Sequence, residues 1–205
     1  MSLFGRSYGR NISGKVSLGG RPADTSTVAK AVAAGLSYVT EDRKELGLVL
    51  DKLSVRNITL ANLPGVSRSG VLSKQRETRV AEEYRRAMNI RTPGVMQKVV
   101  NLSGGNQQKV VLSKWLFTDP QVLILDEPHR GIDVGAKFEI YGIMNDLAAQ
   151  GRGVVMISSE MPELLGMSDR IYVMNEGRIV GELPRAEANQ ERIMAMIVQS
   201  EGKAA

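Results

Sequence analysis

Two short segments carry the residue types best suited to phosphate chemistry. Residues 102–109 read LSGGNQQK and place Ser103, Gly104 and Gly105 where a helix would begin. Backbone N–H groups in the first turn of a helix have no partner within it, so such a start favours an anion. Residues 122–127 read VLILDE, an apolar run that ends in Asp126 and Glu127. This pattern predicts a buried parallel strand whose carboxylates emerge at the sheet edge where α/β folds bind nucleotides.

Two adjacent carboxylates at a strand end can divide the work of phosphoryl transfer to water. One acid can hold magnesium while the next orients the attacking water. The alternative for Asp126 and Glu127 is a solvent-exposed cap, and the apolar run before them argues against it. The alternative for residues 103–105 is an ordinary N-cap turn.

Periodicity and turn residues predict the elements that would position these segments. The first third should hold a hairpin over 14–20, a helix over 25–34 that Gly35 ends, and a strand over 36–39. Apolar spacings of three and four then predict a helix over 73–90 whose inward face consists of Val80, Tyr84, Ala87 and Met88. A second helix should follow Ser103 and end at Asp119-Pro120. Tyr84 and Trp115 are predicted to pack in the core.

The last third alternates strand and helix signals. Strands are predicted over 122–125, 153–158 and 171–174, and helices over 136–149, 161–165 and 189–199. That order predicts βαβ units and a parallel sheet. Residues 175–177 should make a hairpin turn into a strand over 178–180. Seven methionines on apolar faces are predicted to fill the core: Met144, Met156, Met161, Met167, Met174, Met194 and Met196.

The composition predicts one compact globular unit with a subdomain. The chain has 205 residues, of which 42% are hydrophobic and 24% charged, and it contains no cysteine, which excludes disulfides and thiolate metal sites and fits a reducing cytoplasm. A net charge of +5 raises the question of nucleic acid or an anionic membrane surface as a partner. The densest basic cluster, within 74–86, also carries Glu77, Glu82 and Glu83, which favours a solvated helix face over a phosphate-binding stripe. We therefore expect no nucleic-acid partner.

The sequence contains neither a signal peptide nor an apolar run of the roughly 18 residues that a transmembrane helix needs. If the chain works at a membrane, another subunit must supply the span.

Taken together, these segments resemble a known family over nearly the whole chain, from Phe4 to about Ser200. The run at 102–109, the EDRK at 41–44 and the DEPHRGIDVGAK at 126–137 occur in order and at matching spacing. They resemble the second nucleotide-binding domain of the tandem ATPase subunit in bacterial monosaccharide ABC importers. The resemblance implies a P-loop NTPase-like α/β fold with an inserted helical subdomain.

The resemblance also implies roles for particular residues. Asp126 is similar to the Walker B aspartate that reaches magnesium, and Glu127 to the general base. Asp133 resembles the aspartate that couples two nucleotide sites. The signature contacts are carried by Ser103, Gly104, Gly105 and Gln107. In the family they meet the γ-phosphate of ATP bound by the opposite domain.

Three departures from the family pattern limit the predicted activity. The P-loop motif G-x-x-x-x-G-K-[ST] does not occur in the sequence. Residues 5–11 are glycine-rich but match it only superficially. We therefore expect the chain to start after the P-loop, with residues 1–3 as a leader. Ser159 stands where the family usually has a switch histidine, and Glu41 stands where a glutamine is usual. A hydroxyl cannot carry the positive charge of an imidazolium, and a carboxylate beside phosphate repels it.

The only histidine, His129, stands where the family more often has threonine. We interpret it as an incidental loop substitution, with a phosphate sensor as the alternative.

The sequence thus predicts a P-loop NTPase-like ABC ATPase domain that lacks its Walker A segment, divided into 4–50, 51–118 and 119–200. Expected cofactors are ATP and Mg²⁺, and expected partners are a second nucleotide-binding domain, permease subunits and, indirectly, a sugar-binding protein. The expected location is the cytoplasmic face of the plasma membrane. The fragment alone should be inactive. A catalytically degenerate module, a nucleoside importer ATPase and a chromosome-maintenance ATPase remain alternatives, the last requiring long coiled-coil arms that 51–118 is too short to form.

Overall fold

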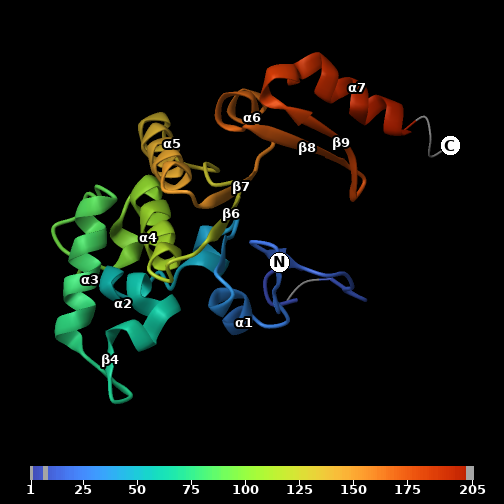
Figure 1. The fold of residues 1–205 in the computed structure, drawn as a ribbon. Coiled ribbons are helices and arrows are strands. Elements are labelled where there is room, and N and C mark those ends of the chain that lie inside the picture. The colour runs from blue at the N-terminus through green and yellow to red at the C-terminus, as the bar shows by residue number, and fades with distance from the viewer. Residues whose placement is uncertain (1, 7–8, 202–205) are drawn as a thin grey trace. The chain divides into compact units, whose positions relative to one another are not determined.

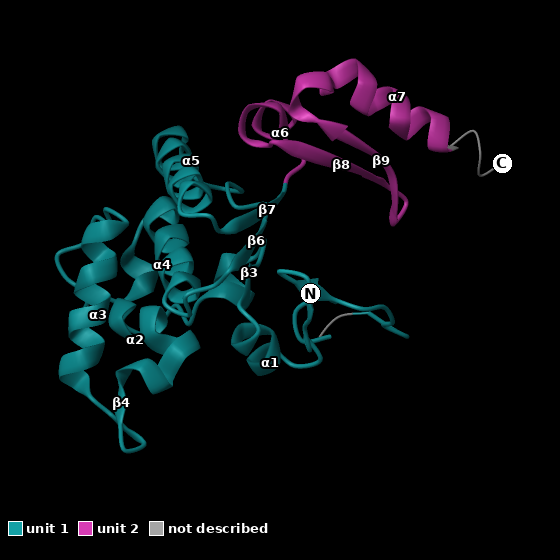
Figure 2. Cartoon of the chain, viewed as in Figure 1, with its two compact units in different colours: residues 1–157 teal, residues 158–205 magenta. Residues whose placement is uncertain are grey.

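The structure is a computed structural model that describes residues 2–6 and 9–201 (Figure 1). Met1 of the expected leader and residues 7–8 of the glycine-rich segment 5–11 lie outside the described residues. The chain forms two compact units, Met1–Ile157 and Ser158–Ala205 (Figure 2), so the prediction of a single unit is wrong. The boundary between the units falls inside the predicted segment 119–200, and the three predicted segments stay a prediction.

A parallel three-stranded sheet forms the centre of the first unit. Its order is β3 (Leu36–Val39), β6 (Val122–Asp126) and β7 (Gly153–Ile157), with Leu36 opposite Val122 and Val122 opposite Gly153. Helix α5 (Val134–Ala149) connects β6 to β7 as the crossover of a βαβ unit. These elements confirm the predicted parallel arrangement. All four residues of β3 and the middle of β6 are buried, as strands covered on both faces require.

The N-terminal part of the first unit matches its predicted order with shorter elements. Strands β1 (Ser17–Leu18) and β2 (Arg21–Pro22) pair in an antiparallel hairpin. Helix α1 (Val28–Ala33) follows, with the Thr27 side chain as its N-cap. Gly35 then takes a φ of 88°, the left-handed conformation that ends a helix and favours glycine.

Short helices make up the part between β3 and β6. The elements are a π-helical turn over Arg43–Gly47, α2 (Ser54–Thr59), 3-10 segments over Leu60–Val66 and Val99–Asn101, the hairpin β4 (Ser67–Arg68) and β5 (Val71–Leu72), α3 (Lys74–Ala87) and α4 (Gly104–Leu116). Helix α2 packs against both α3 and α4. Ser73 caps α3 and confirms the predicted start of that helix. Asp119 and Pro120 follow the end of α4, as predicted.

The inward face of α3 differs from the prediction. Its buried residues are Glu77 and Ala81, whereas Ala87, which was predicted to face inward, is exposed. The carboxylate of Glu77, only 2% exposed, receives hydrogen bonds from Arg56 of α2 at 2.6 Å and from the Thr59 hydroxyl at 3.3 Å. A charged residue therefore lies at the centre of this helix contact.

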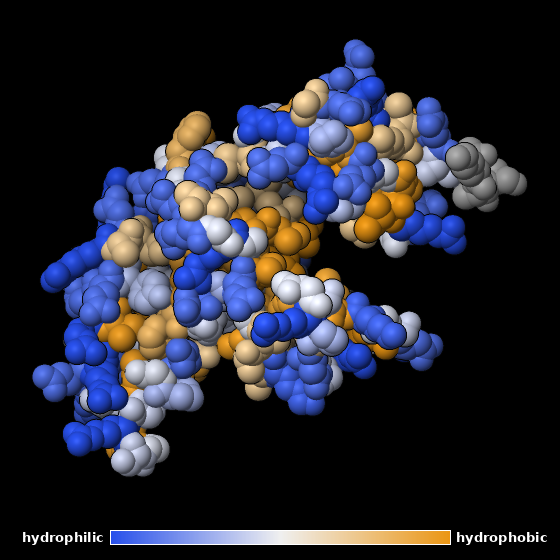
Figure 3. Space-filling view, viewed as in Figure 1, coloured by the Kyte–Doolittle hydropathy of each residue, from blue (hydrophilic) through white to orange (hydrophobic). Residues whose placement is uncertain are grey.

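The outer face of α3 carries mixed charges. Arg85 pairs with Glu82 at 2.7 Å, and Arg79 lies 3.8 Å from Glu83. Hydrophilic side chains dominate the left edge of the space-filling view, over this helix (Figure 3). This arrangement confirms a solvated helix face stabilised by pairs one turn apart.

Two aromatic residues pack against other rings as predicted, although each is only half-buried. Trp115 of α4 meets Phe4 edge-on at 5.3 Å between ring centroids. Tyr84 of α3 meets Phe117, just beyond the end of α4, at 6.1 Å. Tyr84 thus contacts the residue that follows α4, and both rings serve packing.

The second unit is an antiparallel hairpin covered by helices. Strand β8 (Arg170–Asn175) pairs with β9 (Arg178–Pro184) through the predicted turn at 175–177. In residues 158–201 β8 pairs only with β9, so the expectation that it extends the parallel sheet is not met. Helices α6 (Met161–Met167) and α7 (Gln190–Glu201), with a 3-10 turn over Arg185–Glu187, complete the unit, and its core is Ile171, Val173, Leu183 and Ile193.

The methionine prediction holds only in part. Met144 is buried, but Met174 is 64% exposed and Met194 is also exposed, so the core assignment is wrong for these two. Met174 is exposed because it alternates along β8 with Val173, whose side chain lies in the core of the unit. None of the described helices combines the length and apolar character that a membrane crossing demands.

Removing the Glu77 carboxylate should destabilise the contact between α2 and α3. In Glu77→Ala, Arg56 and Thr59 lose a buried acceptor, and because the Arg56 side chain is 44% exposed we expect a loss of about 1–3 kcal/mol in unfolding free energy, below the full cost of breaking a buried pair. Urea unfolding followed by circular dichroism measures it. Glu83→Ala, in an exposed pair, is the control and should change stability by less than about 0.5 kcal/mol. Equal losses in both variants would contradict the analysis.

Candidate functional site

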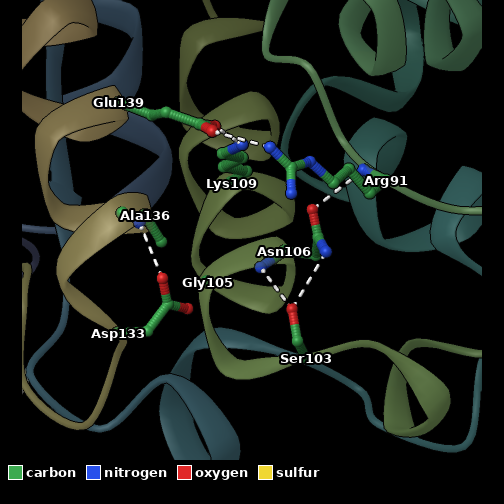
Figure 4. Close-up of a pocket in the computed structure, with 9 residues that line it drawn as sticks. Arg91, Ser103, Gly105, Asn106, Lys109, Asp133, Ala136 and Glu139 are labelled. Carbon is green, nitrogen blue, oxygen red and sulfur yellow. Dashed lines mark hydrogen bonds and ion pairs between the residues drawn. The ribbon is translucent and has the colours of Figure 1, made fainter.

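Helices α4 and α5 begin beside the same small pocket of the first unit (Figure 4). Its volume is about 100 Å³. The lining residues come from the two helix starts and from the loop after α3: Arg91, Ser103, Gly105, Asn106, Lys109, Asp133, Gly135, Ala136 and Glu139. Three of the predicted site residues, Ser103, Gly105 and Asp133, are therefore brought together.

Each helix start at the pocket carries a side-chain cap. The Ser103 hydroxyl accepts hydrogen bonds from Asn106, at 3.4 Å from the backbone N–H and 2.9 Å from the side-chain amide. Asp133 Oδ1 accepts the Ala136 N–H at 2.9 Å. Ser103 is thus an N-cap, which was its alternative interpretation, and it also lines the pocket.

The two glycines of the α4 start lie against neighbouring segments, and the approach is closest at Gly105. A Cβ added to Gly105 would lie 2.4 Å from the Cβ of Ala136 on α5. A Cβ on Gly104 would lie 2.8 Å from the Arg43 guanidinium and 3.0 Å from the Gly131 carbonyl oxygen. Both positions therefore serve the approach of neighbouring segments, whatever contacts they make with a ligand.

Gln107 does not face the pocket with its side chain. It is 6% exposed, and its amide donates to the carbonyl oxygens of Val99 and Leu102, each at 3.2 Å. This placement argues against a ligand contact by the side chain, and the predicted signature role of Gln107 stays a prediction. The amide ties α4 to the 3-10 turn before it, and Asn106 presents its side chain at the pocket instead.

A charged network that sequence reasoning missed closes one side of the pocket. Lys109 is 3% exposed, forms an ion pair with Glu139 of α5 and donates to the Asn89 carbonyl at 3.0 Å. Arg91 lies 3.5 Å from Glu139, and its backbone N–H donates to the Asn106 side chain at 2.9 Å. The only sequence signal for this network is Lys109, which lies one turn beyond Gly104 and Gly105. Its acidic partner lies 30 residues away.

The formal charges of the pocket lining cancel. Lys109 and Arg91 offset Glu139, and the Asp133 carboxylate is engaged as a cap. An anion at this pocket would therefore interact mainly with the free N–H groups of the α4 start.

The adjacent carboxylates lie at the carboxyl end of β6, as predicted. Asp126 accepts a hydrogen bond from the Tyr38 hydroxyl of β3. Burial first, and then this bond, raise the pKa of Tyr38 well above its usual range, so the phenol remains a donor. Glu127 has a φ of 45°, a left-handed conformation that is uncommon for a residue with a side chain, and its N–H donates to the Ile157 carbonyl at 2.9 Å. Strained backbone of this kind clusters at functional sites.

The loop after β3 contacts the loop after β6. Glu41 forms an ion pair with Arg130. Arg43 donates to the carbonyl oxygens of Arg130 at 2.7 Å and Gly131 at 3.1 Å. The three sequence segments singled out at 41–44, 102–109 and 126–137 therefore meet within one compact unit.

Helix α4 also reaches the loop after β3. The buried Lys114 ammonium donates to the Gly47 carbonyl at 2.5 Å. Burial lowers the pKa of Lys114 to about 8. This contact ties the helix that starts at the pocket to the segment that follows Glu41.

Ser159 belongs to the second unit and is exposed. The neighbouring Ser158 hydroxyl contacts the buried Glu163 carboxylate and accepts the Glu160 N–H at 3.1 Å. The assignment of Ser159 as the switch position stays a prediction.

His129 is buried, with its ring centroid 4.6 Å from that of Tyr141 on α5. Its observed contact is packing between the loop after β6 and the crossover helix.

The carboxylates at the end of β6 suit a magnesium ion that takes its remaining ligands from phosphate and water. In residues 2–6 and 9–201, no three His, Asp or Glu side chains gather into a metal site. Magnesium in nucleotide sites is held by one or two carboxylates, with phosphate and water oxygens as the remaining ligands. The half-buried Asp126 carboxylate fits that role.

A parallel sheet with these loops at its carboxyl edge is typical of α/β nucleotide-binding folds. A family model described as ABC transporter matches residues 3–130, which is more than half of the chain, so the chain belongs to the ABC transporter family.

Several relatives are named as sugar transport or import ATP-binding proteins. The chain is 56% identical over 200 residues to the L-arabinose transport ATP-binding protein AraG of Geobacillus stearothermophilus, covering 98% of this chain and 39% of that protein. It is 54% identical over 193 residues to the xylose import ATP-binding protein XylG of Geobacillus kaustophilus, covering 94% of this chain and 38% of that protein. The chain thus spans about two fifths of the length of these relatives.

Solved structures support the fold. A nucleotide-free ATP-binding cassette from an ABC transporter superposes with a TM-score of 0.71 at 16% identity, over 97% of this chain and 78% of that chain. An ATP-binding cassette in its ADP conformation gives a TM-score of 0.72 at 19% identity, over 96% of this chain and 79% of that chain. The predicted ABC ATPase fold with a helical insertion is confirmed, and the lack of a Walker A segment stays a prediction.

A side chain at position 105 should force α4 and α5 apart. We expect Gly105→Ala to destabilise the chain by about 1–3 kcal/mol, as overpacking does. The matched control is Gly142→Ala in the interior of α5, where nothing lies within 4 Å of an added Cβ. That variant should gain about 0.5–1 kcal/mol, because alanine is the better helix former. Thermal unfolding should therefore shift in opposite directions. Stabilisation of both variants would refute the close approach at Gly105.

Proposed function

We propose that this chain is the second ATP-binding domain of a subunit that energises monosaccharide import. The observation that carries the proposal is the meeting of three segments in one unit: the α4 start, the acidic end of β6 and the loop after β3. The names of the relatives supply the substrate class, because AraG and XylG are described as sugar transport proteins. ATP and magnesium are the proposed cofactors.

The proposed chemistry is phosphoryl transfer to water, which depends on positioning and charge neutralisation. Asp126 would hold magnesium, which would supply charge neutralisation for the transferred group. Glu127, whose backbone conformation is fixed by its bond to Ile157, would orient the attacking water and accept its proton. Ser159 is proposed as a hydrogen-bond donor to phosphate.

The pocket at the α4 start would serve ATP that another domain holds. Ser103, Gly104 and Gly105 would direct backbone N–H groups at its γ-phosphate, with Asp133 beside them at the start of α5. The Gln107 side chain has no part in this proposal, because it is buried and bonded to backbone.

The proposed partners are a second nucleotide-binding domain, permease subunits and, through them, a sugar-binding protein. Exposed apolar side chains on the loop after β3 and on the helices that follow, Leu46, Val49, Leu60 and Leu63, support a protein-docking surface there. The proposed location is the cytoplasmic face of the plasma membrane.

A catalytically degenerate module is the second candidate. Ser159 favours it, because serine cannot relay charge as histidine does. The other departure from the family pattern, Glu41, is weaker support for a degenerate module than the sequence alone indicates. The Arg130 guanidinium pairs with the Glu41 carboxylate, which reduces its repulsion of phosphate. Glu127, placed at the strand end, favours retained chemistry.

The 205-residue chain by itself should neither hydrolyse ATP nor bind it tightly, because no phosphate-cradling G-x-x-x-x-G-K-[ST] occurs in its sequence. Calorimetric titration of the chain with magnesium and ATP is the measurement. A dissociation constant in the low micromolar range would contradict this expectation.

In the complete subunit, Ser103→Arg should depress ATP turnover more than Glu127→Gln does. The arginine would block the α4 start, and losing a donor to transition-state charge already lowers rates about 10²- to 10³-fold. Gly105→Asp is unsuitable as a second blocking variant, because its Cβ would collide with Ala136 within the domain.

Side-by-side turnover of the purified transporter decides the order of the two effects. Gln75→Arg, which adds the same charge at an exposed position of α3, is the control and should retain turnover. A larger loss in Glu127→Gln would show that the site built by this domain's own acids dominates.

A further inference from the structure

A tyrosine hydroxyl meets the Asp126 carboxylate from the neighbouring strand. Tyr38 of β3 donates its phenolic hydrogen to Oδ2 of Asp126. Neither the sequence pattern of the acidic segment nor the proposed function assigns a role to Tyr38.

The parallel register explains how this side chain reaches the carboxylate. Tyr38 pairs with Ile124, so Asp126 lies two residues further along β6 and on the same face of the sheet. Diagonal neighbours of this kind lie within reach of long aromatic side chains. A shorter side chain at position 38 would fall short of the carboxylate.

The tyrosine ring is held in place by an aromatic cluster. Tyr38 is 6% exposed and stacks on Phe4, with ring centroids 6.0 Å apart and planes 25° apart. Phe4 in turn meets Trp115 of α4 edge-on. The hydroxyl is therefore presented to Asp126 by a ring with little freedom to turn away.

We propose that Tyr38 is a positioning residue for the Asp126 carboxylate, which it holds by Oδ2 so that Oδ1 faces a divalent cation. This inference rests on the proposed role of Asp126 in holding magnesium. A neutral donor orients the carboxylate without competing with the cation as a positive charge would. Outer partners of metal-binding carboxylates act in this way, and their loss typically weakens metal affinity about 10- to 100-fold.

A packing role alone would make a different prediction. Phenylalanine preserves the ring, its stacking on Phe4 and its burial, so Tyr38→Phe would then leave metal affinity unchanged. The positioning role predicts that the affinity falls when only the hydroxyl is removed.

The experiment uses the complete ATPase subunit that contains this chain. Mn²⁺ is titrated in the presence of a non-hydrolysable ATP analogue, and its binding is followed by electron paramagnetic resonance. Tyr38→Phe should weaken Mn²⁺ binding about tenfold, while its thermal midpoint stays within a few degrees of the parent protein. Tyr84→Phe removes a phenolic hydroxyl from α3, away from Asp126, and should bind Mn²⁺ as the parent does.

Asp126→Asn separates the failure of this inference from the failure of the proposed function. If Asp126→Asn weakens Mn²⁺ binding and Tyr38→Phe does not, Asp126 keeps its role and the positioning role of Tyr38 is overturned. If neither variant changes the affinity, or if the parent binds no Mn²⁺ with the analogue, both proposals are overturned. A loss in Tyr84→Phe equal to that in Tyr38→Phe would also overturn the positioning role.

Discussion

The contact between the first turns of α4 and α5 is the constraint on which the site depends. These helices approach so closely at Gly105 and Ala136 that an added Cβ would lie 2.4 Å from its neighbour. Because helix starts carry unpaired N–H groups, bringing two of them together concentrates partial positive charge in one small pocket. The Lys109–Glu139 ion pair ties the same two helices one turn further along. Packing and electrostatics therefore fix the pocket together.

Contacts between loops extend this constraint to the acidic end of β6. Arg43, from the loop after β3, donates to the backbone of the loop after β6. Its guanidinium also lies against Gly104, so this side chain links its own loop to the loop after β6 and to the start of α4. Lys114 anchors the far side of the π-helical turn to α4. The acidic end of β6 and the pocket are consequently connected through side chains that bond the backbone of several loops.

Much of this arrangement could be predicted from the sequence, because the signals were local. An apolar run ending in two acids marks β6, and serine before glycines marks the start of α4. The failures involve partners that are distant in sequence. Glu77 is buried because Arg56 offers it a charge from another helix, and Gln107 turns inward because the carbonyl groups of a 3-10 turn accept its amide hydrogens. The charge pattern alone assigns Glu77 to a solvated face, and no local signal predicts that the Gln107 amide bonds backbone carbonyl groups.

The aromatic cluster beside the carboxylates gives the chain an optical property. Trp115 is its only tryptophan, and only Phe4 separates its ring from the tyrosine that bonds Asp126. The Lys114 ammonium also lies 4.7 Å from the centre of the indole ring. Indole emission is sensitive to nearby charge and ring contacts. The tryptophan emission of this chain, excited where its five tyrosines do not absorb, therefore originates at one place beside the strand pair and α4.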